Sequence, residues 1–197
     1  MQNVKTFKDI FTFDLLKLSD EGRFLSFKRN SDTFTDVTDK ILNQPIISVG
    51  LKSQYLYMEG DTFKASPIKQ MFTDEEKKRY KELNGKNKRY RMIYLPNSKL
   101  VYIFTYTNGI AESFYVSEVG ISDMFKIVGI EKRTTIHAKS KKMGVKFYAP
   151  ILEKLNEVAL DETDKATIKE LKSYFEPFKP VETTSATDEV EAPEVTF

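Results

Sequence analysis

The middle of the chain consists of short, mainly apolar segments that are separated by polar and turn residues. They are residues 46–51, 55–58, 90–95, 100–106, 127–137 and 145–152, and they are rich in β-branched and aromatic side chains. Both features favour β-strands, because short apolar runs bounded by turn residues fit buried strands, and β-branched and aromatic side chains pack well on a sheet. The pattern therefore predicts a mainly β fold with peripheral helices, in which 127–137 and 145–152 pair as a hairpin.

One helix between these segments is marked by its own start signal. Thr73 precedes three acidic residues, and Glu76 stands three positions after it. This spacing is typical of a capping box, so we expect a helix over 74–83 that ends before Gly85. A second, shorter helix over 113–125 is expected to cross the sheet.

The two ends of the chain differ in how clearly they can be assigned. Residues 7–18 are rich in Phe, Ile and Leu, and the pattern leaves helix and strand equally open. A short strand is expected at 24–28 and a loop at 30–39, where Ser, Thr and Asp gather. Towards the other end, a helix is predicted to begin near Thr163. Its apolar stripe is Ile168, Leu171 and Phe175.

Composition divides the 197 residues into four predicted parts. An N-terminal extension, 1–43, packs on a core of 44–157, which is followed by a C-terminal helix, 158–178, and a disordered acidic tail, 179–197. The chain has no cysteine, no apolar leader and no run of apolar residues long enough to span a bilayer. We therefore expect a cytoplasmic protein without disulfides and without a membrane contact.

Charge is distributed unevenly along the chain. The last seventeen residues hold five acids and no Lys or Arg, so within a net charge of +2 residues 1–180 carry +7. Such a tail competes electrostatically with nucleic acid for a basic surface, and a terminal aromatic residue can anchor a partner protein. The predicted partner-binding residues are Asp188, Glu189, Glu191, Glu194 and Phe197. The alternative is a solubilising terminus whose final Phe is accidental.

Residues suited to catalysis are scarce. His137 is the only histidine, and no glycine-rich phosphate-binding motif occurs. Asp123 and Glu131, beside Lys132, are the nearest approach to the acid cluster of a metal-dependent nuclease, at a spacing that is common by chance. We therefore expect no enzyme activity, no cofactor and no metal.

Aromatic and basic residues gather on the predicted strands and turns. The candidate nucleic-acid-binding residues are Tyr55, Tyr57, Lys86, Lys88, Arg89, Arg91, Tyr94, Tyr102, Phe104, Tyr106, Lys132, Arg133, Lys139, Lys141, Lys142, Lys146 and Tyr148. Cations for phosphates and aromatic faces for unpaired bases are what a single-stranded ligand needs. The alternatives are that the rings form the core and that the basic clusters are solvated turns.

These segments resemble the OB-fold single-stranded DNA-binding proteins of bacteria and their phages. Residues 91–94 and 100–103 look like the central strands of that family, 127–136 and 145–153 look like a closing hairpin, and an acidic tail with a terminal Phe is also shared. The family's tail ends in Pro-Phe, whereas this chain ends in Thr196-Phe197. The resemblance implies a five-stranded OB-like barrel and a tail that recruits replication or repair proteins.

The prediction is a protein that coats single-stranded DNA during replication or recombination, with RNA and a homo-oligomer left open. One rival is a protein–protein adaptor or virion component, which would show no salt-sensitive DNA affinity. The other is a small metal-dependent nuclease that would depend on Asp123 and Glu131.

Overall fold

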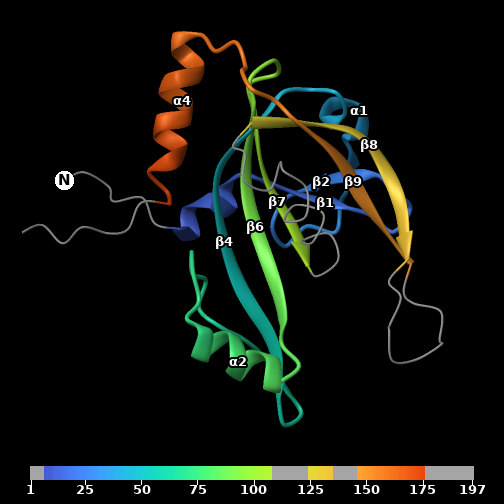
Figure 1. The fold of residues 1–197 in the computed structure, drawn as a ribbon, viewed down its shortest axis with the longest axis vertical. Coiled ribbons are helices and arrows are strands. Elements are labelled where there is room, and N and C mark those ends of the chain that lie inside the picture. Colours follow the sequence, from blue (N-terminus) through green and yellow to red (C-terminus); the bar gives the residue numbers. More distant parts are fainter. Residues whose placement is uncertain (1–6, 108–123, 135–145, 176–197) are drawn as a thin grey trace, which may run out of the picture.

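In the computed structural model, residues 7–107, 124–134 and 146–175 are described (Figure 1). Nine strands and four helical segments follow one another along this part of the chain. The strands are β1 (Asp14–Leu18), β2 (Phe24–Phe27), β3 (Thr35–Asp36), β4 (Ile46–Glu59), β5 (Thr62–Ala65), β6 (Lys86–Leu95), β7 (Leu100–Thr107), β8 (Met124–Thr134) and β9 (Lys146–Lys154). The helices are the 3-10 helix η1 (Phe7–Thr12), α1 (Thr38–Ile41), α2 (Asp74–Glu82) and α4 (Glu162–Lys172). The mainly β fold class is confirmed.

All nine strands belong to one mixed, open sheet. Its order is β3-β2-β1-β7-β6-β4-β8-β9, and β5 pairs with the far end of β4. Among the described strands, β1 and β7 run parallel and the other pairs are antiparallel. The expected closed five-stranded barrel is not formed by the described strands, because β3 and β9 end the sheet without pairing with each other. One end of the sheet consists of β3, β2 and β1, which come from the predicted N-terminal extension.

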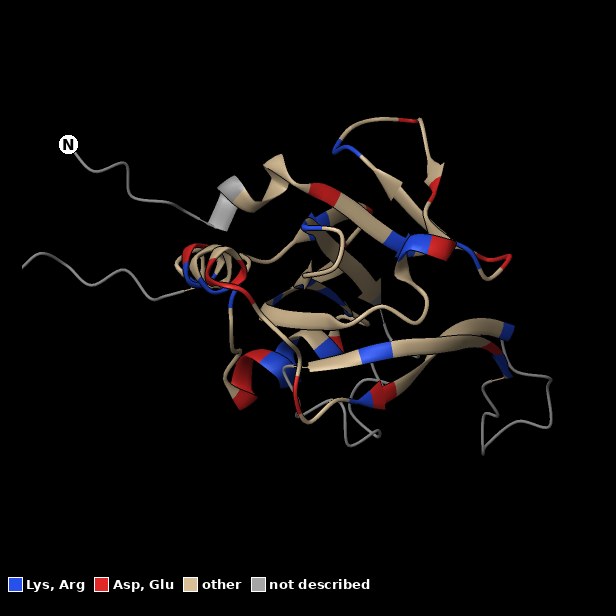
Figure 2. Cartoon of the chain, turned by 90° about the horizontal axis from the view of Figure 1, so that it is seen from above, with Lys and Arg blue, Asp and Glu red and all other residues tan. Residues whose placement is uncertain are grey.

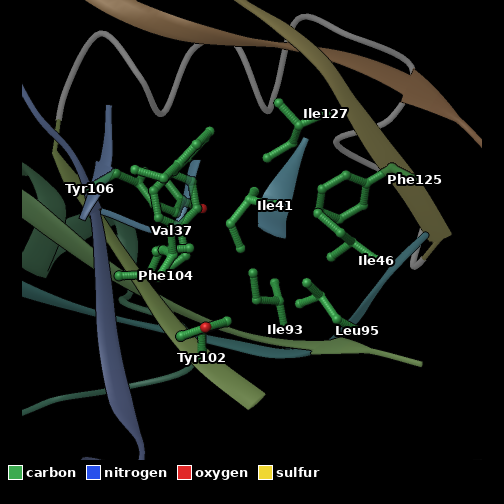
Figure 3. Close-up of a cluster of buried hydrophobic side chains, with 12 residues drawn as sticks. Val37, Ile41, Ile46, Ile93, Leu95, Tyr102, Phe104, Tyr106, Phe125 and Ile127 are labelled. Atoms are coloured by element: carbon green, nitrogen blue, oxygen red, sulfur yellow. The ribbon is translucent and has the colours of Figure 1, made fainter. Parts of the chain in front are cut away.

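Two hydrophobic cores lie on opposite faces of the central strands, because side chains alternate along each strand. On the face that we call the inner face, Ile93 and Leu95 of β6 pack with residues of β7, α1 and β8 (Figure 3). On the opposite face, called the helix face, Met92 and Tyr94 pack with Ile10 of η1 and with residues at the end of α4. Burying both faces explains why β6 is apolar at almost every position of its second half.

The two longer helices, α2 and α4, begin at or near the positions that the local sequence predicts. Thr73 caps α2 through its hydroxyl, which accepts a hydrogen bond from the Glu76 backbone at 3.3 Å, while the Glu76 carboxylate accepts one from the Thr73 backbone at 3.0 Å. The predicted capping box is thus confirmed. The chain leaves α2 through Asn84, whose φ is 51°. α4 is also confirmed, and Asp161 rather than Thr163 marks its start as the N-cap.

Several strand and loop assignments need correction. The two predicted strands at 46–51 and 55–58 are one strand, β4, because β6 pairs with it continuously from Leu56 back to Ile47, around a bulge at Val49. The loop expected at 30–39 contains β3 and the start of α1. Residues 7–18 contain both a helical turn and a strand, since η1 is followed by β1. The predicted hairpin of 127–137 with 145–152 is confirmed over its described part, β8 and β9.

The helix expected at 113–125 lies mostly outside the described residues, and its last two positions begin β8. Among the described helices, none has the length and apolar content needed to cross a membrane.

Candidate nucleic-acid interface

Four aromatic residues predicted to bind nucleic acid lie in the protein core instead. Tyr94, Tyr102, Phe104 and Tyr106 are between 1% and 5% exposed. Tyr102, Phe104 and Tyr106 do share one face of β7, as their spacing predicts, and this is the inner face, which α1 and β8 cover (Figure 3). Their rings are therefore enclosed by the fold and cannot stack on bases in this conformation, so these four assignments are wrong.

Tyr55 and Tyr57 also share one face of β4, and α2 covers that face. The ring of Tyr55 stacks on Tyr80 of α2, with 4.6 Å between the ring centroids and 15° between the planes. The ring of Tyr57 lies tilted against the same Tyr80, 5.2 Å away. Both tyrosines therefore anchor α2 to the sheet and remain only partly exposed.

The two arginines of β6 point to the inner face, because they alternate with residues of the helix face. Arg91 is 7% exposed and donates hydrogen bonds to the Ser48 hydroxyl at 2.8 Å and to the Tyr106 hydroxyl at 3.4 Å. Its assignment as a phosphate-binding residue is wrong, since the guanidinium is enclosed at the edge of the core. Arg89, two positions earlier, is half-buried, and burial lowers the pKa of its guanidinium.

Lys86 and Lys88, in contrast, lie on a sheet face that carries further lysine and apolar side chains. In the register of β4 with β6, Lys86 is opposite Leu56, Lys88 is opposite Gln54, and Tyr90 is opposite Lys52. Directly opposed residues share a face, so these side chains project on the same side as the helix-face core, beyond the end of α4. We call the surface the lysine face. Its strand positions are Lys52, Gln54, Leu56, Met58, Phe63, Ala65, Lys86, Lys88 and Tyr90.

Side-chain contacts agree with this assignment of faces. The Lys88 ammonium lies 5.6 Å from the centre of the Tyr90 ring, and the Tyr90 hydroxyl donates a 2.9 Å hydrogen bond to the Gln54 side chain. The Lys52 ammonium lies 5.8 Å from the ring of Phe175, which follows α4. Partial burial lowers the pKa of both lysines. Apolar surface therefore surrounds the charges and strengthens their attraction for an anion.

The outer end of the lysine face carries the most exposed aromatic ring of the described residues. Phe63 of β5 is 65% exposed and lies opposite Met58 of β4, which is also exposed. The only acidic residue of this β4–β5 hairpin's strands, Glu59, projects from the other face and is bound by Lys64. None of the nine strand positions of the lysine face is acidic. Cations and one exposed ring therefore share this face, without a competing carboxylate on its strands.

A second basic cluster lies on the β8–β9 hairpin, at the end that leads into residues 135–145 (Figure 2). The Lys132 ammonium lies 5.7 Å from the Tyr148 ring of the neighbouring strand, and Lys146 is exposed. Arg133 is bound to Glu131, with 2.6 Å between Nε and the carboxylate. Lys139, Lys141, Lys142 and all of the predicted tail residues lie outside the described part of the chain.

The nuclease alternative depends on Glu131 and Asp123. Glu131 is engaged by Arg133, and Asp123 lies outside the described residues. Within the described ranges, no three acidic or histidine side chains come together as metal ligands would.

Of the nine lysine-face positions, only Lys86 and Lys88 were predicted from the sequence, and the missed positions include Phe63 and Lys52. Phe63 belongs to a four-residue strand too short to show alternation, and Lys52 falls where the pattern suggests a break between two strands. The turn at Gly60 was the available signal, because a hairpin there places Phe63 beside Met58.

Comparisons with protein-family models, curated proteins and solved structures found no match, so function is inferred from this chain's own geometry.

Proposed function

We propose that this protein binds single-stranded nucleic acid on the lysine face, with little preference for sequence. The observation that carries the proposal is the acid-free arrangement of Lys52, Lys86 and Lys88 on the same sheet face as the exposed ring of Phe63. Lysines attract the phosphates of any sequence, and an aromatic ring stacks on any base. An open sheet face suffices for this role, so the proposal does not require a closed barrel.

The β8–β9 hairpin extends the basic surface in this proposal. Lys132 and Lys146 are exposed, and the sequence continues into Lys139, Lys141 and Lys142. In this role the protein coats single-stranded DNA during replication or recombination, and the acidic tail recruits partner proteins. RNA offers the same phosphates and bases, and the binding experiment compares the two directly.

The test is a fluorescence titration of oligo-dT, oligo-rU and duplex competitor against the full-length protein at low salt. Phe63→Ala is expected to weaken binding about 5- to 150-fold, since one base–aromatic stack contributes about 1–3 kcal/mol. The matched control is Lys78→Gln with Lys81→Gln on α2, which packs on the opposite face of the same strands through Tyr80. Unchanged affinity in Phe63→Ala, or equal loss in the control, would place the site elsewhere.

The adaptor role is favoured by one feature, the exposed cross-strand pair of Met58 and Phe63. Exposed apolar side chains that stand together commonly mark protein interfaces. An adaptor predicts that the wild-type protein binds no oligonucleotide even at low salt. That result would replace the nucleic-acid proposal.

A further inference from the structure

A small pocket opens on the opposite side of β4 and β6 from the lysine face. It has a volume of about 280 Å³ and lies between these two strands and the segment 70–72. Its lining includes Leu51, Tyr55, Met71, Phe72, Asn87 and Arg89. The pocket thus combines apolar walls with a few polar groups, which is the usual chemistry of a small-molecule site.

Two aromatic rings form a fixed wall. The rings of Tyr55 and Phe72 meet edge to face, with 5.0 Å between their centroids and 84° between their planes. Tyr55 is held from its other side by the stack on Tyr80. Met71, at 80% the most exposed of the large apolar side chains described, has the flexible thioether that adapts to varied ligands.

The polar group that distinguishes the pocket is the amide of Asn87. Its Oδ1 is buried and accepts no hydrogen bond from any described residue. Leaving a buried acceptor without a donor is unfavourable, so a ligand N–H that reaches it is favoured. An Asn amide offers one acceptor and two donors in a plane, which is the arrangement that pairs with the edge of a nucleobase.

Charge at the pocket favours an anionic ligand. Arg89 supplies a guanidinium to the lining, and its neighbour along the inner face is Arg91. Lys77 of α2 also lines the pocket, although it forms an ion pair with Asp74 at 2.9 Å. The cationic groups therefore exceed the acidic ones among the lining residues.

We propose that this pocket binds the base of a nucleotide, with Asn87 pairing to the base edge and the phosphate directed towards Arg89. The volume lies at the lower end of the range of about 300–1,000 Å³ that is usual for small-molecule pockets, so it suits one ring system rather than a dinucleotide. The ligand is a free mononucleotide or the terminal nucleotide of a strand, which share this chemistry. The proposal does not rest on the lysine face, because the two sites lie on opposite faces of the same strands.

The experiment is a calorimetric titration of the full-length protein with the four deoxynucleoside monophosphates, the matching nucleosides and inorganic phosphate. Saturable binding of at least one monophosphate, tighter than its nucleoside or phosphate alone, is expected. Asn87→Leu should weaken it about 10-fold, because the polar contact to the base edge is lost. Asn156→Ala, at an exposed position after β9, serves as the matched control and should change nothing.

A second variant covers the case in which Asn87→Leu fails to fold, which circular dichroism would reveal. Met71→Glu adds a negative charge on an exposed side chain and should weaken the monophosphate more than the nucleoside. Oligonucleotides with and without a 5′ phosphate, titrated against Phe63→Ala, separate a strand end from a free nucleotide. Absence of saturable binding by all four monophosphates, or equal binding by wild type and both variants, would overturn the proposal.

Discussion

The Tyr94 hydroxyl donates a hydrogen bond of 2.6 Å to the carboxylate of Asp164, seventy residues further along the chain. The same carboxylate oxygen accepts a bond of 2.6 Å from Lys99, which also reaches Asp161 at 3.0 Å. Asp161 and Asp164 form the capping box of α4, so the contacts join the first turn of that helix to β6 and to the β6–β7 turn. Lys99 holds a φ of 55°, a strained value for a residue with a side chain. The network fixes α4 in place over the helix face.

Removing the Tyr94 hydroxyl should therefore lower the stability of the whole domain. Tyr94→Phe is expected to reduce the free energy of unfolding by about 1–2 kcal/mol, because it leaves the buried Asp164 with one donor fewer. Urea denaturation followed by circular dichroism measures the change. Tyr57→Phe, which removes a phenol outside this network, is the control and should cost less than about 0.5 kcal/mol. Equal losses would mean that the contact with Asp164 adds nothing.

The pH dependence of stability should reflect the ionisation of the Asp164 carboxylate. Lys99 and Tyr94 hold the pKa of Asp164 at about 2, below its ordinary value of 3.8. Because the folded pKa is the lower one, the native state favours the charged form, and this contribution is present above pH 3.8 and lost as the pH falls towards 2. Asp164→Asn should flatten the stability profile in this window. Lys99→Met removes the contact that contributes most to lowering the pKa of Asp164, so it should narrow the pH range over which stability is lost. If the loss of stability at acid pH is unchanged in both variants, Asp164 is not the group responsible.

The open sheet curls so far that its last strand contacts the turn between β1 and β2. A Cβ built on Gly22 would lie 2.8 Å from the Tyr148 ring of β9, and Gly22 has a φ of 75°. Gly60 has a similar φ of 60° with nothing near its Cβ position. Gly60→Ala should therefore cost only the backbone strain of about 1 kcal/mol, while Gly22→Ala should cost clearly more.

A double-mutant cycle tests the cause of that difference. Tyr148→Ala should remove the excess cost of Gly22→Ala and leave the cost of Gly60→Ala unchanged, as measured by urea denaturation. If Gly22→Ala and Gly60→Ala destabilise the protein equally, β9 does not press on the β1–β2 turn in solution.

Local features of the fold could be predicted from sequence because the interactions behind them are local. The capping box of Thr73 and Glu76 and the alternation along β6 and β7 depend on residues only a few positions apart. The open sheet was not predicted, because whether a sheet closes into a barrel depends on the pairing of strands that are far apart in the sequence. The parallel pairing of β1 with β7 joins residues such as Leu15 and Ile103, and no short-range pattern encodes it.

The candidate site was predicted only in part for a related reason. Alternation shows that Tyr102 and Phe104 share a face, whereas whether that face is covered depends on α1 and β8. Lys86 and Lys88 could be picked out as a cluster, but aligning them with Lys52 requires the register of β4 against β6. Composition thus identified the kinds of side chain, and tertiary pairing decided which of them reach the surface.

The salt dependence of oligonucleotide binding should show how many lysines contact phosphate. Three contacts from Lys52, Lys86 and Lys88 predict a slope of log K against log salt concentration of about −2, since each contact on a single strand contributes about −0.7. Lys86→Gln should reduce the magnitude of the slope by about 0.7, and Lys132→Gln reports whether the β8–β9 hairpin contributes as well. Fluorescence titrations of oligo-dT between low and moderate salt provide these slopes. A slope that changes with Lys132→Gln and not with Lys86→Gln would place the site on the hairpin instead of the lysine face. The reason is that only the cations that contact phosphate release counterions from the nucleic acid.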